Sequence, residues 1–139
     1  MKKILLISGI ILLLSSCEKE AVKPPSEDSL IAQEAFGLAD SLRSLYEGKD
    51  FEGLKDYATE QGYNDIKKDL AEFKGVSLSF TPRLVEIKAE AVYLNISWQA
   101  SWSINGKVKE AKGMAVFELT GSPLKLNRII RASPFKIPD

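Results

Sequence analysis

The sequence predicts an α+β domain in which N-terminal helices pack on an antiparallel β-sheet formed by the second half of the chain. Between residues 27 and 73 apolar residues recur at intervals of three and four, the spacing of an amphipathic helix. From Val76 the interval changes to two, which is typical of half-buried strands. Asn105-Gly106 separates two such alternating segments and favours a two-residue hairpin turn.

Three helices are expected before the sheet. Side chains that cap helix N-termini, and glycines that end helices, divide this region into three segments. The first helix is expected to begin after Ser26 and to end at Glu47. The expected boundary residues of the three helices are, in order, Ser26 and Gly48, Asp50 and Gly62, and Asn64 and Gly75.

The strand region is expected to begin with two short strands, because Pro82 interrupts the alternation that starts at Val76. Every even position in residues 91–104 is apolar, which predicts one long strand with a single buried face. The Asn-Gly turn then sets the register of the next strand, and in this register the two apolar faces coincide. The expected partners are Ile104 and Lys107, Trp98 and Gly113, Ile96 and Ala115, Leu94 and Phe117, and Val92 and Leu119.

A last strand is expected over Leu124–Ala132, after a loop at 120–123 and before an irregular tail at 133–139. Unbroken alternation would place Arg128 on the apolar face, where a guanidinium needs an anionic partner. A small bulge would instead turn Arg128 outward and Ile129 inward, and the sequence leaves both arrangements open. Unbroken alternation gives the partners Leu124 and Leu119, Leu126 and Phe117, Arg128 and Ala115, and Ile130 and Gly113.

Three helices followed by long antiparallel strands resemble the NTF2-like (cystatin-like) α+β superfamily. The residues that carry the resemblance are 48–54, the Asn105-Gly106 hairpin, and the segments 117–119 and 126–130. The resemblance covers residues 27–132 and implies a curved sheet that wraps the helices around a cone-shaped pocket. Members use this pocket for catalysis, for ligand binding or not at all, so the fold alone does not choose a function.

The first seventeen residues resemble the signal of a bacterial lipoprotein. Lys2 and Lys3 precede an apolar run over 4–14, which is too short for a membrane span of about 20 residues. Leu14-Ser15-Ser16-Cys17 resembles a lipobox, which implies that Cys17 is the lipidated N-terminus of the mature chain. The expected organisation is a signal peptide at 1–16, lipidated Cys17 with a tether at 17–26, and an NTF2-like domain at 27–139.

This organisation predicts a protein of the bacterial cell envelope, with its domain outside the cytoplasm and its lipid in the bilayer. Glu18 follows the cysteine, whereas an Asp there retains lipoproteins in the inner membrane of some bacteria, so the outer membrane is favoured. The chain has 19 Lys plus Arg and 19 Asp plus Glu, without the basic excess of a nucleic-acid-binding protein.

The composition argues against catalysis. The chain has no histidine, and its one cysteine is the residue expected to carry lipid. Catalytic members of the resembled superfamily generally combine an acidic residue with His or Tyr in the cone. Asp65 and Asp69 are spaced one helical turn apart, but such a pair is more typical of a solvated face than of a cation site. We therefore expect no catalytic residues, no metal and no cofactor.

Two groups of residues are candidates for binding. A pocket in the cone would be lined by Trp98, Trp102 and Phe117, with Arg128 as its polar handle; the alternative is that the aromatic residues form core. Trp102, which is nearer the hairpin turn, is expected to be the more exposed of the two tryptophans. A docking face of mixed polarity on the other side of the sheet would be formed by Tyr93, Asn95, Ser97, Met114 and Val116.

The expected function is that of a non-catalytic, membrane-anchored module that binds another envelope protein or a second copy of itself through the docking face. The alternative is a domain that binds a small ligand in the cone. The sequence alone does not identify the partner, the ligand or the biological process.

Overall fold

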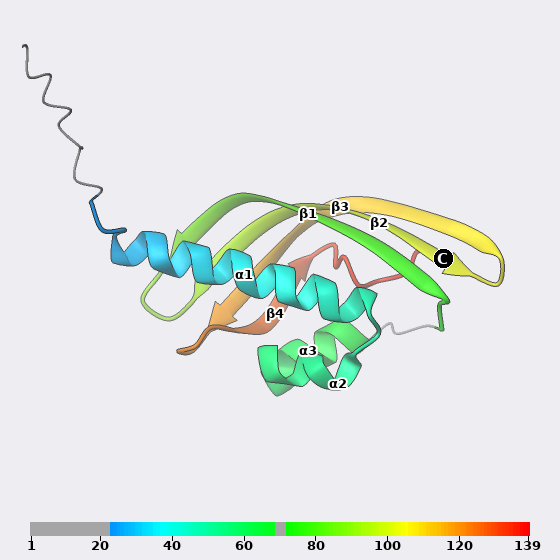
Figure 1. The fold of residues 1–139 in the computed structure, drawn as a ribbon, viewed down its shortest axis with the longest axis horizontal. Helices are drawn as coiled ribbons and strands as arrows, with labels where there is room; N and C mark the ends of the chain where they lie inside the picture. Colours follow the sequence, from blue (N-terminus) through cyan, green and yellow to red (C-terminus); the bar gives the residue numbers. More distant parts are fainter. Residues whose placement is uncertain (1–22, 69–71) are drawn as a thin grey trace, which may run out of the picture.

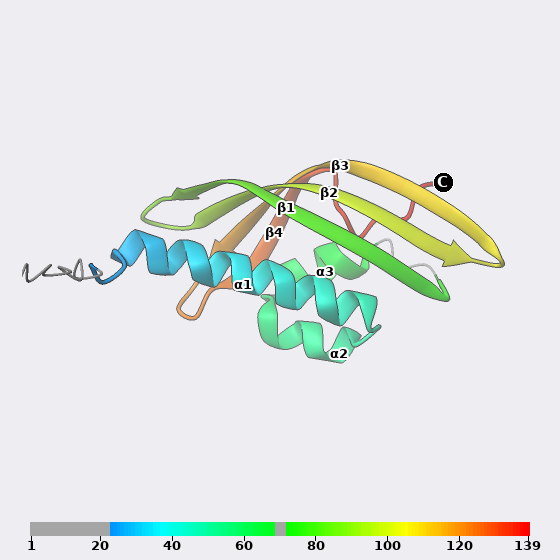
Figure 2. The ribbon, with the colours of Figure 1, turned by 45° about the horizontal axis from the view of Figure 1, so that its top comes forward.

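The computed structural model describes residues 23–68 and 72–139 (Figure 1). The elements in these residues are α1 (Glu27–Glu47), α2 (Phe51–Leu54), the 3-10 helix η1 (Lys55–Tyr57), α3 (Glu60–Lys67), β1 (Gly75–Ile87), β2 (Val92–Ile104), β3 (Lys107–Thr120) and β4 (Lys125–Arg131). The strands form one antiparallel sheet in the order β1-β2-β3-β4. The sheet arches over α1, which lies along its concave side, and α3 packs against β4 (Figures 1 and 2). The predicted fold class, α+β with N-terminal helices on a curved antiparallel sheet, is confirmed.

Helix α1 begins and ends close to the predicted residues. The Ser26 hydroxyl accepts a hydrogen bond from the Ser29 N–H at 3.2 Å, as an N-cap does. Gly48 is the C-cap but keeps a helical φ of −79°. The left-handed residue is Lys49, with φ of 56°. Its N–H donates to the Tyr46 carbonyl and the Asp50 N–H to the Leu45 carbonyl, so a non-glycine residue completes a Schellman ending.

The second helix has the predicted cap, but the third does not. The Asp50 carboxylate accepts from the Gly53 N–H at 2.9 Å, which confirms that cap. The prediction that Gly62 ends a helix and Asn64 caps the next is wrong. Thr59 is the N-cap of α3, and its hydroxyl accepts from the Gly62 N–H at 3.1 Å. The predicted end of this helix at Gly75 is also wrong, because Gly75 is the first residue of β1.

Gly62 lies inside α3 because the helix touches the backbone of β4 there. A β-carbon on Gly62 would meet the Leu126 carbonyl oxygen at 2.0 Å, closer than any side chain allows. The Thr59 N–H donates to the same carbonyl at 2.8 Å. Helix α3 therefore packs directly on the main chain of the sheet edge, and only glycine permits this approach.

Strand β1 is one strand of 13 residues, not the two short strands that were predicted. Pro82 pairs with Ile96, and a bulge between Pro82 and Leu84 lets the pairing continue to Ile87. A proline without an N–H is tolerated because β1 is an edge strand. Helix α1 covers part of this edge, where the Leu78 N–H donates to the Glu47 carboxylate at 3.2 Å.

The predicted hairpin between β2 and β3 is confirmed pair by pair. Ile104 is opposite Lys107, Trp98 is opposite Gly113, and Leu94 is opposite Phe117. Asn105 and Gly106 both have positive φ, at 50° and 75°, as a type I′ turn requires.

The register predicted between β3 and β4 is wrong, because Leu126 and not Leu124 is opposite Leu119, and a bulge follows. Thr120 pairs with Lys125 and Glu118 with Arg128, so Asn127 is an extra residue in a bulge. The Asn127 amide donates to Glu118 at 3.0 Å, and its carbonyl accepts from the Thr59 hydroxyl at 3.0 Å. The bulge therefore keeps Arg128 out of the core and turns Ile129 inward. The observed partners are Leu119 and Leu126, Phe117 and Ile129, Val116 and Ile130, and Ala115 and Arg131.

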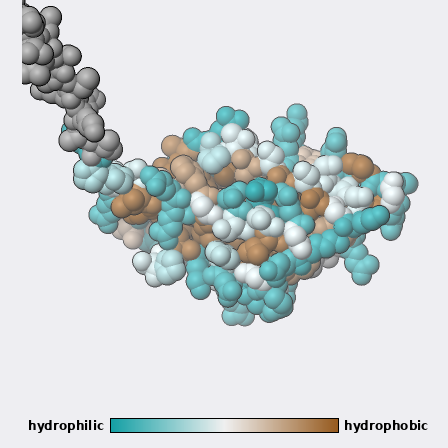
Figure 3. Space-filling view, in the orientation of Figure 1, coloured by the Kyte–Doolittle hydropathy of each residue, from teal (hydrophilic) through white to brown (hydrophobic). Residues whose placement is uncertain are grey.

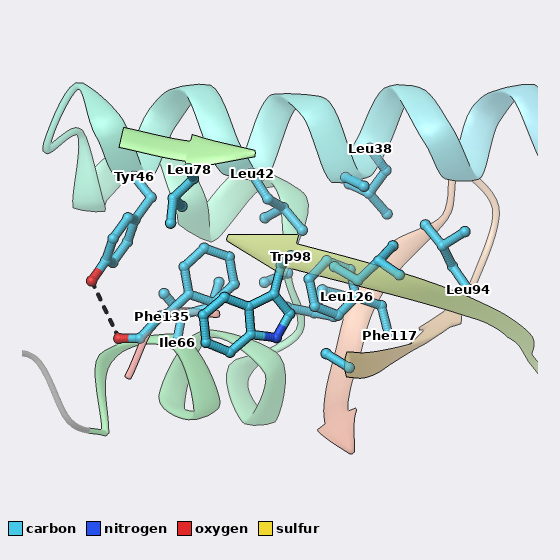
Figure 4. Packing of buried hydrophobic residues seen from close by; sticks show 14 of the residues in the cluster. Leu38, Leu42, Tyr46, Ile66, Leu78, Leu94, Trp98, Phe117, Leu126 and Phe135 are labelled. Atoms are coloured by element: carbon cyan, nitrogen blue, oxygen red, sulfur yellow. Dashed lines mark hydrogen bonds between the residues drawn. The ribbon is translucent and has the colours of Figure 1, made fainter. Parts of the chain in front are cut away.

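The core fills the space between the concave face of the sheet and the helices (Figure 4). Tyr46 from α1, Trp102 from β2 and Phe117 from β3 are each 0% exposed. The residues after β4 have no regular structure, as predicted, but they are not a solvated tail. Phe135 is 1% exposed and packs at the centre of this core.

Candidate functional site

The residues predicted to form a pocket do not share one. Trp98 is 5% exposed and Trp102 and Phe117 are 0% exposed, so all three are core. The expectation that Trp102 is the more exposed tryptophan is wrong, because Trp102 packs in the core and is less exposed than Trp98. Arg128 lies on the opposite face, where its guanidinium contacts the Glu118 carboxylate at 3.2 Å. The four residues therefore lie on two sides of the sheet.

The concave face is filled by Phe135, which sequence reasoning left in an irregular tail. Its ring lies 4.8 Å from that of Tyr46 and 6.2 Å from that of Phe117, centroid to centroid. The Tyr46 hydroxyl donates to the Phe135 carbonyl at 3.2 Å, and burial raises the pKa of that hydroxyl (Figure 4). The signal for this packing was present in the sequence, since Phe135 and Ile137 are unusual residues for a solvated segment.

The five residues of the predicted docking face do come together. On β2 the odd positions, and on β3 the even positions, point away from the helices. Asn95 pairs with Val116 and Ser97 pairs with Met114, so these four form a block on the convex face. Tyr93 is the next outward residue along β2 and pairs with Glu118. Met114 is 44% exposed, which is high for a large apolar side chain in the middle of a sheet.

Two further apolar residues extend this face across all four strands. Leu84 of β1 pairs with Asn95, and Ile130 of β4 pairs with Val116. Leu84 is 53% exposed. Sequence reasoning missed both, because the bulges in β1 and β4 decide which way they point. With these two additions to the five predicted residues, the docking face consists of Leu84, Tyr93, Asn95, Ser97, Met114, Val116 and Ile130.

A partly buried carboxylate, that of Glu118, lies at one border of the docking face. Glu118 is 12% exposed and accepts hydrogen bonds from Asn127, Arg128 and Tyr93. The Asn127 amide, the Arg128 charge and the Tyr93 hydroxyl together hold the pKa of Glu118 below its ordinary value. A carboxylate of this kind stays ionised and fully bonded, so it anchors the border and is poorly suited to act as a general base.

The other border of the docking face is a polar hollow of about 550 Å³. Its floor consists of small hydroxyl side chains on β1 and β2, including Ser77, Ser79 and Ser101. Arg83 reaches over a neighbouring hollow and donates to the Ser97 hydroxyl at 3.0 Å. The convex face thus changes from apolar near β4 and the bulge of β1 to hydroxyl-rich toward the hairpin turn.

Within 23–68 and 72–139, no three Cys, Asp or Glu side chains gather in a way that could hold a metal ion. In that part of the chain no helix has the length and apolar character of a membrane span. Cys17, the predicted lipidation site, lies outside the described residues.

Together the fold and this face define an α+β domain with a filled core and a mixed, partly apolar convex surface. Comparison of the chain with protein-family models, with curated proteins and with solved structures found no match in any of the three.

Proposed function

We propose that the protein is a non-catalytic module of the bacterial envelope that binds a partner protein, or a second copy of itself, through the docking face. The observation that carries the proposal is a line of residues across all four strands, Leu84, Asn95, Val116 and Ile130, flanked by exposed Met114. A sheet face with large exposed apolar side chains beside hydroxyls and amides has the composition of protein interfaces.

The geometry of the face favours protein over a small molecule. The line runs across the convex side of the sheet, so it offers a broad open surface and not an enclosed site. Small ligands are usually bound in concave, largely enclosed pockets. The alternative of a ligand-binding cone has less support, because Phe135 occupies the concave side and Arg128 lies outside it.

The proposed location rests on residues 1–17 and on the tether that follows them. Lipidated Cys17 would hold the domain at a bilayer, since two or three acyl chains anchor firmly whereas one does not. Nine residues from Glu18 to Ser26 would let the domain stand roughly 25–30 Å from the lipid surface. Helix α1 begins at Glu27, at one end of the domain (Figure 1), so a tether that precedes it would join the domain there. The same proposal includes the NTF2-like resemblance, because a curved sheet of that kind would present the docking face on its convex side.

The docking face is tested by placing a charge at its centre. Met114→Glu is expected to abolish the cross-linked species formed by the anchored protein in membranes, because a carboxylate would be buried in an apolar contact. The matched control is Val108→Glu, since Val108 is 66% exposed on the same strand and the same face but near the hairpin turn. If both variants cross-link as the unaltered protein does, the docking face is not an interface.

The anchor is tested separately. Cys17→Ser is expected to release the protein from the membrane fraction and to remove the acyl mass from the N-terminal peptide. Mass spectrometry of that peptide checks the modification directly. An N-terminal peptide without acyl groups in the unaltered protein would refute the location while leaving the docking face untouched.

A further inference from the structure

The C-terminal residues are bound to the domain in the manner of a peptide ligand. After β4 ends at Arg131, which has a left-handed φ of 69°, residues 132–139 return across the concave side without pairing to any strand (Figure 1). The segment reads Ala-Ser-Pro-Phe-Lys-Ile-Pro-Asp. Pro134 and Phe135 are buried, Ile137 packs against the core and Lys136 is exposed.

Three side chains of the domain donate hydrogen bonds to main-chain carbonyls of this segment. The indole N–H of Trp98 donates to Ala132 at 2.9 Å. The hydroxyl of Tyr46 donates to Phe135 at 3.2 Å. The ammonium of Lys109 donates to Pro138 at 3.2 Å. The carbonyls are three residues apart, so the domain contacts the backbone of the segment at a regular interval along its length.

The aromatic ring of the segment enters a cage built by other elements. Tyr46 of α1, Phe80 of β1 and Phe117 of β3 surround Phe135, with ring centroids 4.8, 6.1 and 6.2 Å away. Phe117 is nearly parallel to it, at 13° between the ring planes. The walls and the three donors all come from residues before Arg131, and they enclose a groove that the segment occupies.

We propose that this groove is a peptide-binding site whose ligand is a proline-flanked aromatic segment of another chain, and that residues 132–139 occupy it in cis. Short peptides that contain proline are recognised in grooves lined by aromatic side chains. Buried Trp and Tyr side chains line such a groove with their rings and donate hydrogen bonds with their N–H and O–H groups. The site lies on the opposite side of the sheet from the docking face and does not depend on the proposed function.

The tethered tail sets how tightly a free peptide can bind. A segment joined by a short link competes at an effective concentration on the order of millimolar. The apparent affinity for a free peptide is proportional to the fraction of molecules in which the tail has left the groove, so a small open fraction makes binding weak. The unaltered chain should therefore bind weakly, and weakening the tail's own contacts while keeping the walls intact should strengthen binding.

The test uses the full chain and a fluorescent synthetic peptide with the sequence of residues 131–139, followed by anisotropy. Phe135→Ala in the chain is expected to raise the apparent affinity roughly tenfold or more over the unaltered chain. Ile137→Ser, at a partly buried position, should raise it a few-fold. Lys136→Ser is the matched control, since Lys136 is the exposed neighbour of both and should leave the affinity unchanged.

A peptide with alanine in place of its phenylalanine should bind none of these chains, because the cage would lose its occupant. Near-ultraviolet circular dichroism checks that each variant is folded. If Phe135→Ala is unfolded, the peptide affinity of Ile137→Ser tests the proposal in its place. Folded variants that bind no peptide at millimolar concentration, or that bind the alanine peptide equally well, would overturn the proposal.

Discussion

The two faces of β2 and β3 share one backbone but have opposite characters. Residues that point toward the helices, such as Leu94, Ile96 and Phe117, are 0% exposed. Their neighbours in sequence, such as Asn95 and Ser97, are only partly buried and carry small polar side chains. Because successive side chains of a strand point to opposite sides, one set of residues stabilises the fold while the other is free to form a surface.

This difference separates two kinds of substitution. A change on the concave side removes contacts that hold the helices to the sheet, so it should lower the free energy of unfolding. A change on the convex side should leave that free energy nearly unchanged and alter association instead. The predictions below test this separation, from the largest expected change in stability to the smallest.

Phe117→Ala should destabilise the domain by about 3–5 kcal/mol, because it leaves a cavity between the rings of Phe80 and Phe135. Chemical denaturation followed by tryptophan fluorescence measures the change. Phe117→Leu, which fills more of the cavity, should cost less. A loss below about 1 kcal/mol for the alanine variant would show that the concave face is loosely packed and would remove the contrast between the faces.

Gly62→Ala should destabilise the domain by about 1–3 kcal/mol, because the added methyl group would meet the Leu126 carbonyl and push α3 from β4. The matched control is Gly37→Ala in α1, where a β-carbon would have no atom within 4 Å. That change should stabilise by roughly 0.5–1 kcal/mol through helix propensity alone. Thermal unfolding of the two variants checks the pair, and equal effects at both positions would contradict the close approach.

Glu118→Gln should reduce the dependence of stability on pH. Hydrogen bonds from Asn127 and Tyr93 and the charge of Arg128 lower the folded pKa of Glu118 below its ordinary 4.5. The ionised carboxylate therefore stabilises the fold above the unfolded pKa, and this contribution is lost as the pH falls through the folded pKa. Between pH 6 and pH 3, about the range in which carboxylates titrate, the variant should lose less stability than the unaltered chain.

Exposed Glu110 lies on the same strand and face as Glu118, so Glu110→Gln is the control for this measurement. The free energy of unfolding of this variant should depend on pH in the same way as that of the unaltered chain. An unchanged pH profile in the Glu118 variant would mean that the carboxylate does not anchor the border of the docking face.

Met114→Glu should change stability least, by less than about 0.5 kcal/mol, although it is expected to abolish association. Denaturation and cross-linking on the same preparation check both statements. A large loss of stability would show that the convex face is part of the folded core and would erase the distinction between the two faces.

The sequence was sufficient wherever a local pattern and a turn agreed. The alternation over 91–104 and the Asn105-Gly106 turn each favour the same pairing, and a slip by one residue would bury polar side chains. The register of β2 and β3 was therefore predictable in every pair. The same alternation predicted the five central residues of the docking face.

Prediction failed, or left two arrangements open as at Arg128, where contacts between distant residues outweighed local preference. The bulge at Asn127 depends on Thr59 and Glu118, which no pattern near Asn127 reveals. Gly62 resembles a helix end in sequence, but a close approach to Leu126 explains it. The outward direction of Leu84 and Ile130, and therefore the full width of the docking face, follows from the bulges in β1 and β4.

The sequence by itself determined the class of fold, the hairpin register and which residues of β2 and β3 face outward, because these depend on side-chain period and turn chemistry. Only the tertiary structure decided that Arg128 lies outside and that Phe135 fills the concave side. The reason is physical: burying a guanidinium without a partner costs several kcal/mol, about 2–7 even for a neutral polar group, whereas a phenyl ring gains by leaving water. A one-residue bulge and a returning tail satisfy both requirements, and each depends on residues far apart in the chain.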